Sequence, residues 1–269
     1  MQRIYIVGQM LLGLCFVLDA GWNLATYDLR AAYLDTVGAP HFLTLLTAAV
    51  YGICGFALMI GYKRHIMPFP LIGILLLMSL VLLTDVNGQG IGEYPAEFHV
   101  EVIFKEWVVH IAIMGALLFL ATTAPLAEGQ ARPDWHRIGR LAGRAVLGAY
   151  FIINALWQWY YFDIRVEHIV ASGGNPNSLP IVIGVQLLCG LLVAGGRWVW
   201  VTALPLMFII TLSTILVHGN LSPDAPYPAN LQIHQWFVKA SILAGLIMVL
   251  GERSRARAES KRFRMARQT

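Results

Sequence analysis

The chain has 269 residues, of which 58% are hydrophobic and only 13% are charged, and its mean hydropathy is +0.65. Soluble domains carry about 25% charged residues, so this composition excludes an ordinary soluble protein and predicts an all-α integral membrane protein. The formal net charge is +4; membrane lipid is the expected surrounding, and no nucleic-acid partner is predicted.

Eight apolar windows are candidates to cross the membrane as helices, which takes about 20 residues each. In chain order they cover residues 4–25, 41–61, 66–85, 99–121, 139–161, 178–196, 199–218 and 231–251. Cationic segments after the second, fourth, sixth and eighth windows all fall on one side of this arrangement. By the positive-inside rule, both termini are predicted to be cytoplasmic.

The first span and its continuation recur 135 residues later, which predicts a tandem duplication. Each unit has four spans, an even number, so the repeats are predicted to be parallel, related by an axis along the membrane normal. The predicted divisions are a first four-helix repeat (1–123), a cytoplasmic linker (124–138), a second four-helix repeat (139–251) and a basic cytoplasmic tail (252–269). The tail either lies on anionic lipid or serves only as a topology signal.

The three cysteines lie in apolar segments without C-x-x-C spacing, which suggests neither a disulfide framework nor a thiol redox centre. They are interpreted as small apolar helix residues. The first span matches an internal segment, so it is predicted to stay in the mature protein rather than to act as a cleaved signal peptide.

Ionisable residues inside a span are costly and usually face the protein interior, so they are the first candidates for function. On the fourth span His99, Glu106 and His110 share one helical face, and Glu101 and Lys105 form a second. The first predicted polar pocket opens outward and comprises Asp19, Asn23, Asp85, His99, Glu101, Lys105, Glu106 and His110.

A loop match between residues 94–96 and 227–229 resets the offset to 133 for the last span. Glu106 then maps onto Lys239, so a carboxylate and an ammonium group occupy equivalent positions and could pair. Lys105 is a nearer cation in sequence, which leaves this pairing open. The second predicted pocket comprises Asn154, Gln158, His218, Asn220, Gln232, His234, Gln235 and Lys239.

Other roles for these polar residues are open. Asn, Gln, Ser, Thr and His in membrane helices often serve only as hydrogen-bonding contacts between helices. Glu106 and His110 could share a metal ion, but His99 is about 10 Å of helical rise from Glu106. A bis-histidine haem would need a second deep histidine. The sequence therefore favours neither haem nor metal, and it assigns no catalytic residue.

Short glycine-based motifs recur in both halves. They are the segments Cys54 to Gly61 and Cys189 to Gly196, and the polar opening of the last span before Lys239 and Gly245. On these motifs each half resembles the DoxX/DoxD family of four-helix membrane proteins. The resemblance covers almost the whole chain, although the tandem form departs from the usual single unit.

The resemblance implies a redox function. Proteins similar to DoxD are membrane subunits of thiosulfate:quinone oxidoreductases, and other members accompany redox partners. It implies an inner-membrane subunit of a bacterial respiratory complex that binds quinone and works with a redox or periplasmic protein partner. The alternative is a non-enzymatic membrane protein, either a transporter of a small solute through the polar pockets or a scaffold for assembling a partner.

Overall fold

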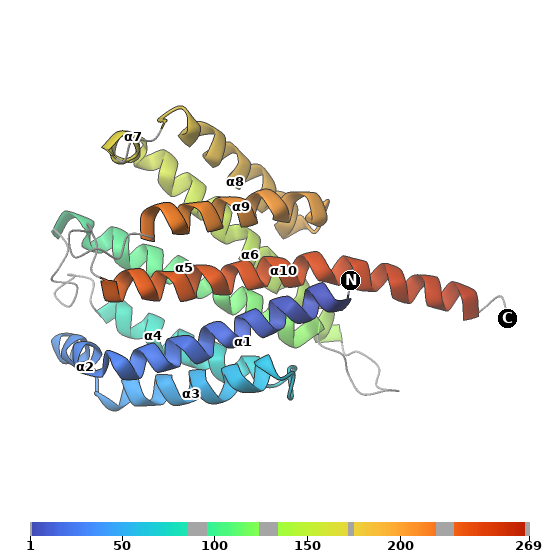
Figure 1. Ribbon diagram of the computed structural model, residues 1–269, viewed down its shortest axis with the longest axis horizontal. Helices are drawn as coiled ribbons and strands as arrows, with labels where there is room; N and C mark the ends of the chain where they lie inside the picture. Colours follow the sequence, from blue (N-terminus) through green and yellow to red (C-terminus); the bar gives the residue numbers. More distant parts are fainter. Residues whose placement is uncertain (1, 85–95, 124–133, 172–174, 219–228, 267–269) are drawn as a thin grey trace.

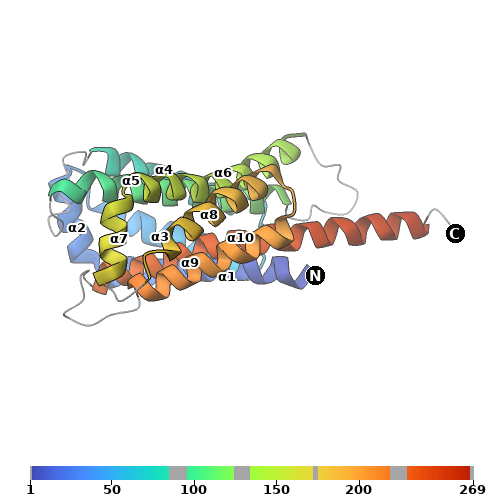
Figure 2. The same cartoon turned by 90° about the horizontal axis from the view of Figure 1, so that it is seen from above.

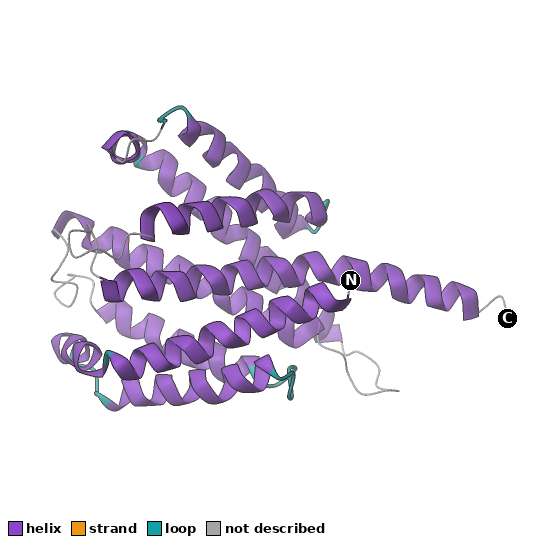
Figure 3. Cartoon of the chain, viewed as in Figure 1, coloured by secondary structure: helices purple, strands orange, loops and turns teal. Residues whose placement is uncertain are grey.

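The computed structural model describes residues 2–84, 96–123, 134–171, 175–218 and 229–266 (Figure 1). Every regular element in this part of the chain is an α-helix (Figure 3). The helices are α1 (Gln2–Ala25), α2 (Tyr27–Thr36), α3 (Phe42–Met59), α4 (Pro68–Thr84), α5 (Ala96–Thr123), α6 (Asp134–Tyr160), α7 (Phe162–Ala171), α8 (Ser178–Gly195), α9 (Val199–His218) and α10 (Ala229–Ala266). The apolar sequence thus forms an all-helical, multi-pass membrane protein.

Six of the eight predicted spans coincide with helices in the described ranges that are long and apolar enough to cross a membrane. They are Arg3–Ala25, Phe42–Met59, Ile103–Thr123, Ser178–Gly195, Val199–Leu216 and Gln232–Glu252. The other two windows are also helical, but one is shorter and the other is more polar than these six. The apolar part of α4, Pro68–Leu83, is shorter. The polar residues Arg140, Arg144, Asn154 and Gln158 make α6 less apolar than the six, and α6 begins inside the predicted linker.

Two short helices, α2 and α7, occupy segments that the sequence analysis treats as outer loops. Each has ten residues, and both lie across the same end of the bundle (Figures 1 and 2). Leu34 of α2 is 1% exposed and packs with Leu43 and Val81. Packing of one apolar face stabilises short helices that would be marginal alone.

The helices of the two predicted repeats interlock. The first span, α1, packs against α3 of its own repeat and against α10 of the other. The corresponding contacts of α6 are with α8 and with α5. Between these pairs, α5 packs against α10 (Figure 1). The first span of each predicted repeat is therefore held by the last span of the other.

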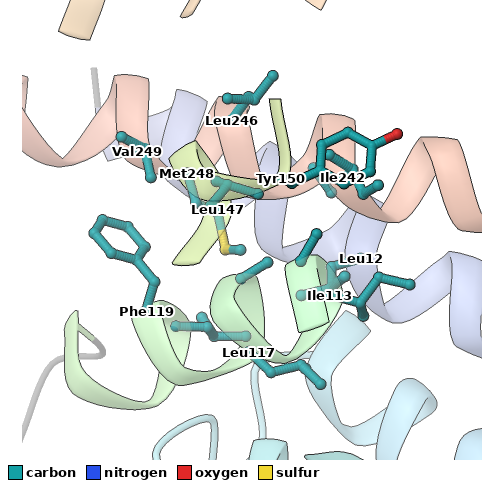
Figure 4. Packing of buried hydrophobic residues seen from close by; sticks show 14 of the residues in the cluster. Leu12, Ile113, Leu117, Phe119, Leu147, Tyr150, Ile242, Leu246, Met248 and Val249 are labelled. Carbon is teal, nitrogen blue, oxygen red and sulfur yellow. The ribbon is translucent and has the colours of Figure 1, made fainter. Parts of the chain in front are cut away.

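The apolar core lies where α1, α5, α6 and α10 meet. Leu12, Phe119, Leu147 and Ile242, one from each of these helices, are at most 1% exposed, and Figure 4 shows them converging. This core joins the four helices that carry most of the candidate polar residues, and so it positions them.

Matched glycines allow close helix contacts at equivalent places in the two halves. A Cβ atom at Gly13 would lie 2.6 Å from the carbonyl oxygen of Gly55, and one at Gly148 would lie 2.6 Å from that of Gly190. Only glycine permits such an approach. Gly55 and Gly190 belong to the Cys-Gly pairs of the sequence, so these pairs mark the α1/α3 and α6/α8 contacts.

Candidate functional site

Two carboxylates from the first half of the chain meet one histidine from the second. Asp19 on α1 is 7% exposed, and its Oδ1 lies 3.3 Å from Nδ1 of His234 on α10. The other ring nitrogen, Nε2, lies 4.0 Å from Oε2 of Glu106 on α5. We call Asp19, Glu106 and His234 the acid–histidine centre. The centre joins helices α1, α5 and α10, because the His234 imidazole on α10 lies between a carboxylate of α1 and a carboxylate of α5.

Neighbouring side chains orient the centre. Asn23, one helical turn after Asp19, donates from Nδ2 to the Asp19 carbonyl at 2.7 Å and to its carboxylate at 3.3 Å. Gln235 donates to the Glu106 carboxylate. Arg30 of α2 approaches Asp19 to 4.0 Å. The Arg30 guanidinium thus lies beside Asp19, and a proton on His234 would place a positive charge between Asp19 and Glu106.

A small cavity continues inward from the centre. Its volume is about 20 Å³, and it is bordered by Asp19, His234, His110 and Ser241. This is room for one water molecule, and the polar lining supplies the two to four partners that a buried water needs. The centre and His110 are therefore within reach of one bridging water.

His110 reaches deeper into the bundle than the centre. It is 8% exposed, and its Nδ1 lies 2.9 Å from Oγ of Ser79. The Ser79 hydroxyl donates to the Leu75 carbonyl at 2.7 Å, so the imidazole Nδ1–H must donate to Ser79. In the neutral ring, Nε2 is then left as the proton-accepting nitrogen.

A second polar cluster lies between α6, α8 and α10. Lys239 donates to the Tyr150 hydroxyl at 3.0 Å. The amides of Asn154 and Gln158 each donate to Oε1 of Gln186, at 3.3 Å in both cases. We call these five residues the amide–lysine cluster. Its members are neutral or basic, in contrast to the acid–histidine centre.

The structure redistributes the two predicted pockets. His234 and Gln235, assigned to the second pocket, contact the acids of the first. Glu106 accepts from Gln235 and Lys239 donates to Tyr150, so the suggested Glu106–Lys239 ion pair does not form between these two described side chains. This correction arises because the last span faces both halves of the bundle.

Two more of the predicted residues lie on described parts of α5 and α10. Gln232 is buried on α10 and Lys105 is partly buried on α5. Asp85 and Asn220, and the side chains of His99, Glu101 and His218, lie outside the described residues.

Sequence reasoning missed four polar contributors. Tyr51 and Ser241 line the cavity, and Tyr150 and Gln186 belong to the amide–lysine cluster. The 135-residue offset contained a signal for three of them, because Tyr51 maps onto Gln186 and Cys15 maps onto Tyr150.

The comparisons with known proteins place the chain in a family. The family model of the TMEM101 protein family matches residues 1–252. The chain belongs to this family. No curated protein and no solved structure matches it. TMEM101 membership covers both halves of the chain and thus the acid–histidine centre as well as the amide–lysine cluster.

The predicted membership in the DoxX/DoxD family is therefore wrong. It rested on glycine and Cys-Gly motifs, and the Cys-Gly pairs lie at the α1/α3 and α6/α8 contacts. Small residues at such contacts meet a general requirement of membrane helix packing. They consequently do not distinguish one helical membrane family from another.

The described residues around the cavity bear on which cofactors could bind there. His, Cys, Asp and Glu in these ranges form no group of three or more that could hold a metal ion. The cavity of about 20 Å³ is far smaller than the roughly 150 Å³ that accommodates benzene. The residues around the cavity therefore do not fit a quinone ring.

Proposed function

We propose that this protein is a proton-coupled membrane carrier of a small solute, with the acid–histidine centre as its proton-binding site. The contact of His234 with Asp19 at 3.3 Å and with Glu106 at 4.0 Å carries this proposal. Ionisable groups that face the interior of a helix bundle are characteristic of proton relays in pumps and transporters.

The chemistry of the centre suits reversible proton binding. Histidine is the side chain whose charge ordinarily changes between pH 5 and pH 8. A proton on His234 would place a positive charge between the Asp19 and Glu106 carboxylates, which both accept it favourably. A water in the cavity would link the centre to His110, whose Nε2 is available to accept a proton. A proton could thus be exchanged between the acid–histidine centre and Nε2 of His110.

This proposal includes the finer topology that the sequence predicts. With α4 and α6 added to the six apolar spans, eight helices form two parallel repeats with both termini cytoplasmic. The 17 residues of α4 rise about 25 Å, which is close to the thickness of the hydrocarbon core. In this orientation the centre lies nearer the external face of a plasma membrane, for which the bacterial inner membrane is the expectation from sequence.

We do not extend the proposal to quinone chemistry. The family resemblance that implied it is overturned, and the cavity at the centre does not fit the ring. A carrier needs only that the centre gain and lose a proton as the solute binds.

The test is the protonation state of His234 in the lipid-reconstituted protein. Nitrogen-15 NMR of the histidine-labelled protein is recorded from pH 8 to pH 5, and the His234 signals are identified by their loss in His234→Gln. The expected result is a change from neutral imidazole to imidazolium within this range. Asp19→Asn should move that change toward lower pH, because the carboxylate stabilises the imidazolium.

Asp28→Asn is the matched control, because Asp28 is an exposed acid on α2. It should leave the His234 transition where it is in the wild type. The proposal fails if the His234 signals are the same at pH 8 and pH 5. It also fails if Asp19→Asn and Glu106→Gln both leave the transition unchanged.

A further inference from the structure

Lys239 places an ammonium group inside the helix bundle. It lies in the apolar span Gln232–Glu252 and is partly buried. Its ammonium group donates to the Tyr150 hydroxyl at 3.0 Å, and no described carboxylate lies within ion-pairing distance. Charged groups at membrane depth normally pair with an opposite charge. Among the described side chains, the contact made by the Lys239 ammonium is therefore with a neutral group, the Tyr150 hydroxyl.

Beyond Tyr150, amide side chains continue along the same face of α6 and offer further hydrogen-bond donors. Tyr150, Asn154 and Gln158 are four residues apart along α6, so they form one stripe on its surface. Gln186 is 3% exposed, and its Oε1 accepts from both amides of the stripe. Its own NH₂ group remains as a donor. The Tyr150 hydroxyl, which accepts from Lys239, likewise keeps its proton to donate.

The two polar sites have opposite charge at equivalent positions. Asp19 corresponds to Asn154 at the 135-residue offset, and Glu106 corresponds to Lys239 at the 133-residue offset. The acid–histidine centre repels an anion, whereas the amide–lysine cluster attracts one. The duplication has thus placed a proton-binding and an anion-binding composition in one helical bundle.

We propose that the amide–lysine cluster binds a small organic carboxylate. The carboxylate accepts from the Lys239 ammonium and the Tyr150 hydroxyl, and the Asn154 amide, one helical turn further along α6, donates to a second polar group of the same molecule. This assigns a substrate class to the proposed carrier, but the binding itself requires only the cluster. Uptake of the anion together with one proton would move no net charge.

The test uses lactate as the probe, with the protein in lipid nanodiscs and saturation-transfer NMR as the readout. Wild type should bind lactate, and Lys239→Met should raise the dissociation constant at least about tenfold, because it removes a charge-assisted hydrogen bond while conserving side-chain volume. Tyr150→Phe should weaken binding less. Lys63→Met is the matched control, since Lys63 is an exposed lysine after α3, and it should bind as wild type.

Each outcome decides the proposal. Wild type that fails to bind lactate overturns it, as does Lys239→Met or Tyr150→Phe with wild-type affinity. Chloride that displaces lactate at equal concentration overturns the carboxylate class. Asp19→Asn should still bind lactate, so failure of the proton-binding centre and failure of the anion site are distinguishable.

Discussion

Substitution of Gly13 by alanine tests the close contact between α1 and α3. The added Cβ would lie 2.6 Å from the Gly55 carbonyl oxygen and 2.6 Å from the Met59 nitrogen. Both neighbours are backbone atoms, so a side-chain rotation cannot relieve the contact. The helices must separate by about 0.8 Å to reach an ordinary contact of 3.4 Å.

The expected cost follows from two opposing terms. Overpacking of a tight contact costs about 1–3 kcal/mol. Replacing glycine by alanine in a helix stabilises the helix by up to about 1 kcal/mol, because alanine has the higher helix propensity. Gly13→Ala should therefore lower the free energy of unfolding by about 1–2 kcal/mol. Gly148→Ala should cost the same, because its Cβ would lie 2.6 Å from the Gly190 carbonyl oxygen.

The assay is unfolding of the purified protein in mixed detergent micelles with increasing sodium dodecyl sulfate, followed by circular dichroism. Gly21→Ala is the matched control on the same helix, because a Cβ there would have no neighbour within 4 Å. It should be as stable as wild type or slightly more stable. If Gly13→Ala and Gly21→Ala unfold alike, the proposed role of the Cys-Gly pairs in helix packing is refuted.

Two further changes test contacts near the other end of the bundle. Tyr5→Phe removes the hydrogen bond between the Tyr5 hydroxyl and Thr123 Oγ1, which are 2.8 Å apart and buried, and should cost about 1 kcal/mol in the same unfolding assay; an unchanged midpoint would contradict this. Glu252→Gln breaks the 3.1 Å ion pair with Arg140, whose partial exposure limits the expected cost to about 0.2–1 kcal/mol. Added salt should reduce the difference in unfolding free energy between Glu252→Gln and wild type. A difference that grows with salt would contradict an electrostatic contact.

Different parts of the molecule were predictable to different degrees. The positions of the long helices follow from runs of apolar residues, because a membrane requires every span to satisfy its own backbone. The short helix α2 was not predicted, since its burial depends in part on the contact of Leu34 with Val81, a residue distant in sequence. The DoxX/DoxD assignment was wrong for a related reason. Glycines such as Gly55 indicate where two helices pack closely, and many unrelated membrane families have such glycines.

For the polar sites, the sequence predicted which residues are candidates but not which of them meet. The sequence identified Asp19, Glu106, His234 and Lys239 as candidates, because ionisable residues stand out in apolar spans. It assigned His234 to the wrong pocket, since no local pattern tells which helix a residue 215 positions away from Asp19 will face. Interlocking of the repeats decides that contact.

The sequence by itself determined that this protein crosses the membrane as helices, because hydropathy is a property of the chain, and the repeat of its two halves stays a prediction from residue identity. Only the tertiary structure decided which acids meet which histidine and that Lys239 turns toward Tyr150. These contacts depend on how α1, α5, α6 and α10 pack around one core, and packing depends on all four surfaces together.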